Sequence, residues 1–363
     1  MNVTPSRTQP PKFRGNTQDA PAAGDVRRRT RAPVLLLALT GLGLSIGGAV
    51  TVGTADLSIG DVFRTLGAHL GLPVTPLPPL ADSIVWNLRT PRVLLAGLVG
   101  GGLAVCGAVL QALTRNPLAD PYLLGISAGA STGAVAVLVL GLGVGTVALT
   151  TGAFTGAIAA FGAALLLAGR RWTEPTRILL AGVAVGQLFS AVTSLIVVST
   201  ASPQQTRGVT FWLLGSLTMA TWPAVVLCAA VAAVALLICW AATPALDAFA
   251  FGADAAQSLG FSPVRVRALL FTTTALLAAV LVAASGAIGF IGLTVPHAAR
   301  IMVGSRHRIL LPTCAVIGAT FLIWADTAAR TVFTPQEVPV GVVTALLGVP
   351  AFAVLIRRRQ APG

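Results

Sequence analysis

One serine in this sequence stands in the pattern of a hydrolase nucleophile. Residues 125–129 (Gly-Ile-Ser-Ala-Gly) match G-x-S-x-G around Ser127, and His297 with Asp326 could complete a catalytic triad. That chemistry requires a strand-to-helix elbow that exposes the serine hydroxyl. Ser127 instead stands early in an apolar stretch with glycine at every fourth position, which is typical of a packed helix. An intramembrane serine hydrolase is therefore an alternative that the local pattern disfavours.

Three arginines stand at the ends of apolar stretches. Arg89 and Arg92 flank Pro91, and Arg330 follows Asp326 by one helical turn, a spacing that allows an ion pair. A charge at the bilayer centre costs about 2.5–3.5 kcal/mol on insertion scales, so these groups belong near a membrane boundary. The arginines are either anchors whose charged ends reach water or a docking patch for an acidic partner. Asp326, an acid within an apolar run, is either a functional group or a member of a structural ion pair.

Other polar residues have structural interpretations. His297 follows Pro296, and no second histidine stands at ligand spacing, so we expect a packing or hinge role and no metal site. Glu337 precedes the last apolar stretch, where its charge suits a helix N-terminus.

The scarcity of lysine and the placement of cysteine exclude several chemistries. Lys12 is the only lysine, so neither a Walker A loop nor a Schiff-base enzyme is available. The four cysteines lie within apolar stretches and form no C-x-x-C pair, which indicates packing roles. We expect no cofactor.

Two segments between apolar stretches carry recognisable polar patterns. In the segment 115–121, Asn116 and Pro117 form a turn, and Asp120 before Pro121 provides an N-cap for the next helix. The segment 244–263 has apolar residues at helical spacing, with Asp247 and Asp254 on its polar side. We expect two short helices at a membrane face. They could lie on lipid headgroups, but the acidic side chains favour a protein partner.

The composition requires these residues to be positioned by membrane helices. Only 10% of the 363 residues are charged, 55% are hydrophobic, and mean hydropathy is +0.86. A 30 Å hydrocarbon core needs about 20 apolar residues per helix. That length predicts an all-α integral membrane protein with about ten spans in one bundle, at 33–53, 91–113, 122–141, 145–169, 176–199, 220–242, 265–286, 290–303, 308–330 and 338–357.

The ends of the chain and its charges set an expected topology. Residues 1–32 are predicted to be a disordered basic cytoplasmic tail, 33–358 the membrane domain, and 359–363 a cytoplasmic end. With both termini inside, all but five of the 24 Lys and Arg residues lie on the cytoplasmic side, in agreement with the positive-inside rule. The charge excess therefore reflects topology in a cell membrane and not a nucleic-acid partner.

A weak internal echo is compatible with an inverted repeat, a common transporter architecture. Gly107-Ala108 precedes Pro117 and Gly125 by the same intervals at which Gly286-Ala287 precedes Pro296 and Gly304. Glycine is abundant enough (39 residues) for coincidence to explain the echo equally well.

Taken in order, several of these segments resemble the permease family of ABC importers for iron-siderophores, haem and cobalamin. The similarity extends from about residue 33 to 357, and Val338 stands where the family usually has leucine. The segments that carry it are Arg89 through Arg92, Gln111 through Pro121, Leu124 through Gly129, Gly286 through Arg300, and Asp326 through Gly341.

The resemblance implies partners for this chain. A second permease subunit, identical or paralogous, would complete the pathway, two ATPase subunits would supply the energy, and an extracytoplasmic binding protein would deliver the substrate. Acids of the binding protein would meet Arg89, Arg92 and Arg330. The ATPases would dock on coupling helices that contain Leu246, Asp247, Phe249, Gly252, Asp254, Leu259 and Gly260.

The expected cargo is a ferric siderophore, with haem and cobalamin as alternatives. Structural or gating candidates are Asn116, Pro117, Pro296, His297, Asp326 and Glu337. An ion-coupled secondary transporter is a further alternative, but it needs several intramembrane carboxylates or histidines as relays, and Asp326 is nearly alone.

Overall fold

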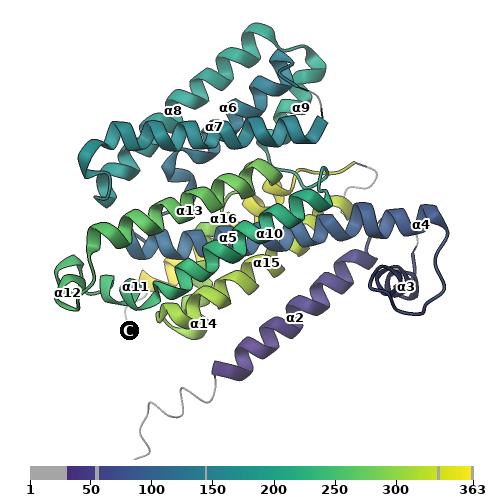
Figure 1. Ribbon diagram of the computed structural model, residues 1–363, viewed down its shortest axis with the longest axis horizontal. Coiled ribbons are helices and arrows are strands. Elements are labelled where there is room, and N and C mark those ends of the chain that lie inside the picture. The colour runs from purple at the N-terminus through teal and green to yellow at the C-terminus, as the bar shows by residue number, and fades with distance from the viewer. Residues whose placement is uncertain (1–30, 54–56, 144, 333–335, 361–363) are drawn as a thin grey trace, which may run out of the picture.

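The computed structural model describes residues 31–53, 57–143, 145–332 and 336–360 (Figure 1). Throughout those ranges the regular structure is helical, from α2 (Arg31–Thr51) to α16 (Val340–Gln360), without a β-strand. The predicted tail of residues 1–32 lies almost wholly outside the described residues, as does most of the predicted end 359–363.

Every predicted span has a helix close to its predicted bounds. Within the described ranges, six stretches are long and apolar enough to cross a membrane, and four further apolar helices are shorter. The long stretches are Pro79–Thr114, which ends in α5 (Thr90–Thr114), Gly145–Arg171, which contains α7 (Gly145–Ala168), α8 (Pro175–Thr200), α10 (Trp222–Ala241), α13 (Pro263–Ser285) and α15 (His307–Thr331). The shorter ones belong to α2, α6 (Ile126–Leu140), α14 (Ile291–Val303) and α16. The predicted all-α membrane bundle is confirmed.

The helices pack as two groups that meet along one seam (Figure 1). In one group α6, α7 and α8 pack on each other, with α9 (Pro203–Leu213) at the end of α6. In the other group α5 is central and packs on α10, α13, α14 and α15, while α2 packs on α15. The seam is formed mainly by α7 against α13.

Glycines allow the closest helix contacts. A Cβ added at Gly129 or Gly133 of α6 would collide with the backbone of Gly156 or Gly152 of α7, so only glycine permits this approach. The same holds at Gly107 of α5, where a Cβ would collide with the carbonyl group of Gly292 in α14. The four-residue glycine spacing in the sequence therefore does mark packing surfaces.

Several short helices lie at one end of the bundle, and the length criterion for membrane spans does not predict them. The helix α3 (Ile59–His69) begins at a capping box in which Ser58 and Asp61 bond reciprocally, and α9 begins at a similar box of Ser202 and Gln205. A short α4 (Pro79–Ser83) leads through a π-helical turn (Ile84–Arg89) into α5. These helices are too short to span, so a 20-residue window does not detect them.

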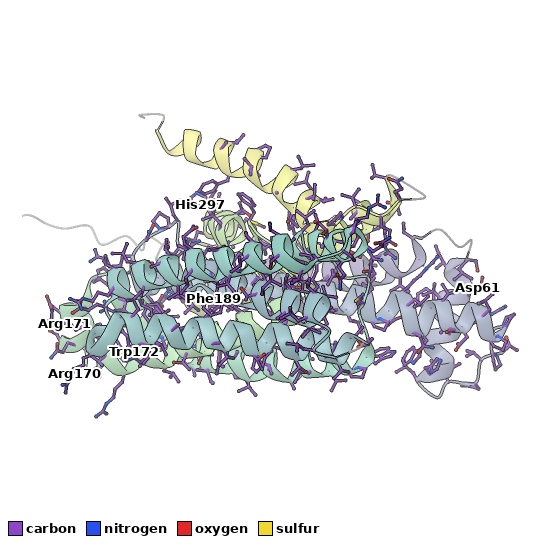
Figure 2. All side chains as sticks on the ribbon, turned by 90° about the horizontal axis from the view of Figure 1, so that it is seen from above. Asp61, Arg170, Arg171, Trp172, Phe189 and His297 are labelled. Carbon is purple, nitrogen blue, oxygen red and sulfur yellow. The ribbon has the colours of Figure 1, made fainter. Side chains whose placement is uncertain are left out.

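Labelled residues place two connections at opposite ends of the molecule. Figure 2 shows Asp61 of α3 at one end and Arg170, Arg171 and Trp172, between α7 and α8, at the other. That separation agrees with the predicted topology, in which these two connections lie on opposite sides of the membrane.

The internal echo does not mark equivalent structural positions. Gly107 lies in the middle of α5, whereas Gly286 follows the end of α13 with a φ of 68°. Pro117 lies in a turn, whereas Pro296 lies inside α14. Different local structures at matched intervals favour coincidence as the origin of the echo.

Candidate functional site

Two of the three outer arginines, Arg92 and Arg330, pair with acids of the same chain. Arg92 makes a two-pronged ion pair with Asp326, with Nε–Oδ2 at 2.9 Å and Nη2–Oδ1 at 3.0 Å. Its Nη1 also bonds Glu337 Oε2 at 3.0 Å. Arg330 approaches Asp326 less closely, with Nε 3.9 Å from Oδ2. The predicted pair of Asp326 and Arg330 is therefore present, but Arg92 is the stronger partner.

Two of these arginines also cap a helix. Arg89 Nη1 donates to the carbonyl groups of Val50, at 3.2 Å, and Thr51, at 3.0 Å, and Arg330 Nη2 donates to the carbonyl group of Ala49. The last carbonyl groups of a helix have no helical donor and form the negative end of its dipole, so guanidinium groups stabilise them. Together with the ion pair of Arg92 and Asp326, these bonds join α2, α5 and α15 at this end of the molecule.

The arginines do not form an exposed patch. Arg89 and Arg330 are 6% and 7% exposed, and the Arg92 side chain is 12% exposed, whereas the Glu337 side chain is 40% exposed. The anchor interpretation, with charged ends reaching water, does not describe these contacts. The predicted docking role stays a prediction, and it now requires a partner that reaches Arg92 past Glu337.

A break in the helical backbone lies between α13 and α14. Residues 286–290 are not helical, and Phe290 has a left-handed φ of 68°. Non-helical backbone within a membrane domain must find hydrogen-bond partners in the protein. Tyr122 provides them, because its hydroxyl group accepts from Ile288 N and donates to Ile288 O, each at 2.8 Å.

The chain positions Tyr122 through the segment 115–121. Asp120 caps the 3₁₀ turn Pro121–Leu124, accepting from Tyr122 N at 2.9 Å, as the N-cap prediction requires. The capped element is this short turn, and α6 begins only after Gly125, whose φ is 79°. Desolvation raises the pKa of the Asp120 carboxyl group to about 6. Asn116 accepts from Leu118 N at 2.9 Å, which gives the turn at Asn116-Pro117 a structural role.

Pro296 explains a further tie to α5. Proline has no N–H group, so Pro296 cannot donate to the carbonyl group of Gly292 four residues earlier. Gln111 of α5 does so instead, with Nε2 3.1 Å from Gly292 O. Arg300 Nη1 then donates to Gln111 Oε1 at 2.6 Å. His297 is buried beside this proline on α14, as a packing role requires.

The predicted coupling segment forms two short helices, α11 (Thr243–Phe249) and α12 (Ala253–Ser258). The candidate residues of this segment fall into two groups, those that contact the bundle and those that are exposed. Leu246 and Phe249 are fully buried, and Asp247 accepts hydrogen bonds from His307 Nδ1 at 2.7 Å and from its backbone N–H at 3.0 Å. These side chains hold the segment on the bundle.

The remaining coupling candidates face outward. Asp254, Gly260 and Leu259 are exposed, Leu259 by 66%, while Gly252, with a φ of 109°, forms the bend between the two helices. Phe251 beside that bend is 83% exposed, although sequence reasoning did not select it. An acidic group between exposed apolar side chains suits contact with another protein.

Neither a hydrolase site nor a metal site is assembled. Ser127 lies within α6, and Asp326 is occupied by Arg92, so the elbow and the acid that a triad needs are missing. In the described part of the chain no three His, Cys, Asp or Glu residues are grouped as metal ligands.

Comparison with known proteins identifies the family. The profile of the FecCD transport family matches residues 34–358. The chain belongs to this family. It is therefore the permease component of an ABC importer and not itself an enzyme, since ATP hydrolysis belongs to a separate subunit. The alternatives of a hydrolase and an ion-coupled transporter are excluded.

Individual relatives agree with this assignment. The cobalamin import system permease protein of Halobacterium salinarum is 38% identical over 336 residues, which cover 91% of this chain and 90% of the relative. The Fe(3+)-citrate import system permease protein YfmD of Bacillus subtilis is 34% identical, with 89% and 93% covered. A metal-chelate type ABC transporter, solved in an inward-facing conformation, superposes with a TM-score of 0.79 at 27% identity and 90% and 99% coverage.

Sequence reasoning missed the residues that hold the broken helix. Tyr122 is the only tyrosine in the chain, but no sequence pattern points to its partner, Ile288, which lies 166 positions away. Arg92 and Asp326 are separated by 234 positions. Such pairs become visible only when the helices are placed in space.

Proposed function

We propose that this permease imports a ferric siderophore, delivered by an extracytoplasmic binding protein, into the cytoplasm. The observation that supports an iron chelate as cargo is the match to the FecCD transport family over residues 34–358, together with the Fe(3+)-citrate permease among the relatives. Cobalamin is a second candidate with equal support, because a named cobalamin permease is 38% identical. Haem remains an alternative within the same family.

Competition between cargoes tests this proposal. The permease would be reconstituted in liposomes with its ATPase and with binding proteins loaded with either a ⁵⁵Fe-labelled siderophore or ⁵⁷Co-labelled cobalamin. We expect ATP-dependent accumulation of iron that excess unlabelled cobalamin does not reduce. Accumulation of cobalt instead would transfer the assignment to the second candidate and leave the importer role intact.

The proposed assembly contains two permease chains, identical or paralogous, and two ATPase subunits, with both termini of each chain in the cytoplasm. The ATPases are proposed to contact the surface formed by Asp254 on α12, Phe251 in the bend before it and Leu259 just after it. This surface is exposed, while Leu246 and Phe249 beneath it are buried in the bundle. Movement of the ATPases would therefore be transmitted to the spans through a segment that is packed on one side and free on the other, which suits alternating access.

A charge reversal with an internal control tests the contact. Asp254→Lys changes an exposed side chain, so it should weaken co-purification of the ATPase without lowering permease expression. Asp247→Asn is the control, because Asp247 bonds His307 within the chain and its loss should lower thermal stability. Unchanged ATPase recovery with Asp254→Lys would refute the proposed contact.

The binding protein is proposed to dock over the outer arginine cluster, defined as Arg89, Arg92 and Arg330. Glu337 is the exposed partner of Arg92, so a carboxylate of the binding protein can take its place without disturbing the buried Asp326. On this basis Glu337→Gln should strengthen docking and Arg92→Gln should weaken it. Equal affinities for both variants and the wild type would refute docking at this cluster.

A further inference from the structure

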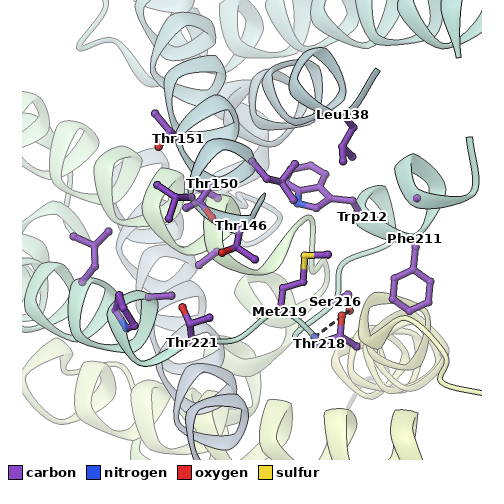
Figure 3. A pocket seen from close by; sticks show the side chains of 18 residues that line it. Leu138, Thr146, Thr150, Thr151, Phe211, Trp212, Ser216, Thr218, Met219 and Thr221 are labelled. Atoms are coloured by element: carbon purple, nitrogen blue, oxygen red, sulfur yellow. Dashed lines mark hydrogen bonds between the residues drawn. The ribbon is translucent and has the colours of Figure 1, made fainter. Parts of the chain in front are cut away.

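A cavity of about 480 Å³ lies in the seam between the two helix groups (Figure 3). Its walls come from the end of α6, the start of α7, α9, the connection from α9 to α10, the start of α10 and the end of α13. Ligand pockets in proteins typically measure about 300–1,000 Å³ and are mostly apolar with a few polar groups. This cavity has both properties, and nothing in the transport function described above uses it.

None of the described residues that line the cavity has a charged side chain. Its apolar part includes Leu138, Leu149, Leu227, Ala283 and Ala284. A ligand that needed a salt bridge would find no partner here. The cavity therefore selects an uncharged portion of a molecule, whatever charge the rest of that molecule carries.

Several hydrogen-bond donors in the lining have no partner among the described residues, although two lining hydroxyl groups do bond each other. Ser216 and Thr218 bond each other, with their hydroxyl oxygens 2.9 Å apart. The hydroxyl groups of Thr146, Thr150 and Thr221, all on half-buried residues, make no hydrogen bond within the described part of the chain, nor does the indole N–H of half-buried Trp212. These groups can be reached from the cavity, so their hydrogen-bond partners must come from whatever fills it. An occupant with acceptor oxygens would satisfy them.

The surroundings indicate that the occupant comes from the bilayer. Every exposed side chain along α10 is apolar, including Leu227 at 52% and Val226 at 64%. By contrast, the exposed face of α8 carries Gln187, Ser190 and Ser194, which suits a partner or an aqueous path. Leu227 both lines the cavity and is exposed on this apolar face, so the cavity borders a helix face that suits lipid.

The position of the cavity along the membrane normal matches that of the ester groups of a lipid. It lies where α7 and α10 begin and where α13 ends, near Trp212 and Trp222, and tryptophan concentrates at the membrane interface. Glycerophospholipids carry their ester carbonyl groups at that interface, with the acyl chains directly below. Carbonyl groups accept hydrogen bonds but do not donate them, and each unpartnered group of the cavity, three hydroxyl groups and one indole N–H, can donate.

We infer that this cavity is a binding site for the ester and upper acyl region of a membrane glycerophospholipid. The donors of Thr146, Thr150 and Trp212 bond the ester carbonyl oxygens, and the apolar wall accommodates the chain. Because none of the described lining residues is charged, the cavity itself does not select for the charge of the lipid headgroup.

Lipid retention by the purified permease tests this site. Detergent-solubilised protein would be incubated with phosphatidylethanolamine whose chains are attached by ester bonds, or by ether bonds that lack the carbonyl group, and bound lipid would be counted by native mass spectrometry. The wild type should retain the ester lipid about tenfold better, since the ether lipid forfeits two neutral hydrogen bonds or more. The variant Thr146→Val/Thr150→Val/Trp212→Phe, in which each valine keeps the shape of threonine and phenylalanine keeps an aromatic ring without the N–H group, should lose this preference.

Two further variants make the result specific. Thr155→Val changes a threonine one turn along α7, outside the cavity, whose hydroxyl group already donates to Thr151 O, and it should behave as the wild type. Ala284→Leu fills the cavity and should reduce retention of both lipids. Equal retention of ester and ether lipids by the wild type would overturn the inference. Displacement of the lipid by the transported cargo would also overturn it, because the cavity would then belong to the transport path.

Discussion

Removal of the Asp326 charge is the sharpest test of the outer arginine cluster. The substitution Asp326→Asn keeps the shape of the side chain but leaves Arg92 and Arg330 without their shared carboxylate. Asp326 is 1% exposed, so water cannot replace it. Loss of one member of a buried ion pair costs about 3–5 kcal/mol, and we expect the free energy of unfolding to fall by that amount.

Glu337→Gln is the matched control, because it removes a carboxylate from the same arginine at a position where the side chain is 40% exposed. An exposed pair contributes only about 0–1 kcal/mol, so this variant should lose no more than that. The assay is reversible unfolding in mixed micelles, followed by circular dichroism. The double variant Arg92→Gln/Asp326→Asn should lose less unfolding free energy than Asp326→Asn alone, since fewer buried charges remain unpaired. Equal losses from Asp326→Asn and Glu337→Gln would refute the claim that burial makes Asp326 the principal anion of the cluster.

Other expectations follow from the contacts within the bundle. Gln111→Leu leaves the carbonyl group of Gly292 without a donor and should lower the free energy of unfolding by about 1–3 kcal/mol in the same assay. Adding Pro296→Ala should recover part of this loss, because alanine supplies a helical N–H group. No recovery would contradict the assigned role of the proline. Gly107→Ala should lower the free energy of unfolding by about 1–3 kcal/mol, because the new methyl group would collide with the backbone of Gly292. Unchanged thermal stability would contradict the close approach of α5 and α14. Asp254→Lys should reduce ATPase co-purification while membrane insertion, measured by fractionation, stays unchanged.

The spans could be predicted from the sequence because lipid imposes a simple rule. A helix that crosses a bilayer needs about 20 apolar residues, so length and composition define it, and α7 or α13 begins and ends within a few residues of the prediction. The two short helices of the segment 244–263 were also predictable, from helical spacing and glycine at the bend. The close contacts of α6 with α7 follow from the glycine spacing in the same way.

The contacts of the candidate site were not predictable to the same extent. The pairing of Arg92 with Asp326 and the bridge from Tyr122 to Ile288 join residues more than 160 positions apart, and no local pattern encodes them. The solvent exposure of the arginines could not be predicted either, because an arginine at the end of a span can face water or cap a neighbouring helix. The sequence favoured the surface for Arg89, whereas the structure assigns it to the carbonyl groups of α2.

This chain conducts its cargo as the permease of an ATP-driven importer. The most direct measurement is uptake of a labelled ferric siderophore into proteoliposomes that contain the permease and its ATPase, with loaded binding protein outside, ATP inside and no ion gradient. We expect uptake that stops when ATP is omitted or the ATPase is left out. Uptake that continues without ATP, or that requires a proton or sodium gradient, would refute the role of an ATP-driven importer.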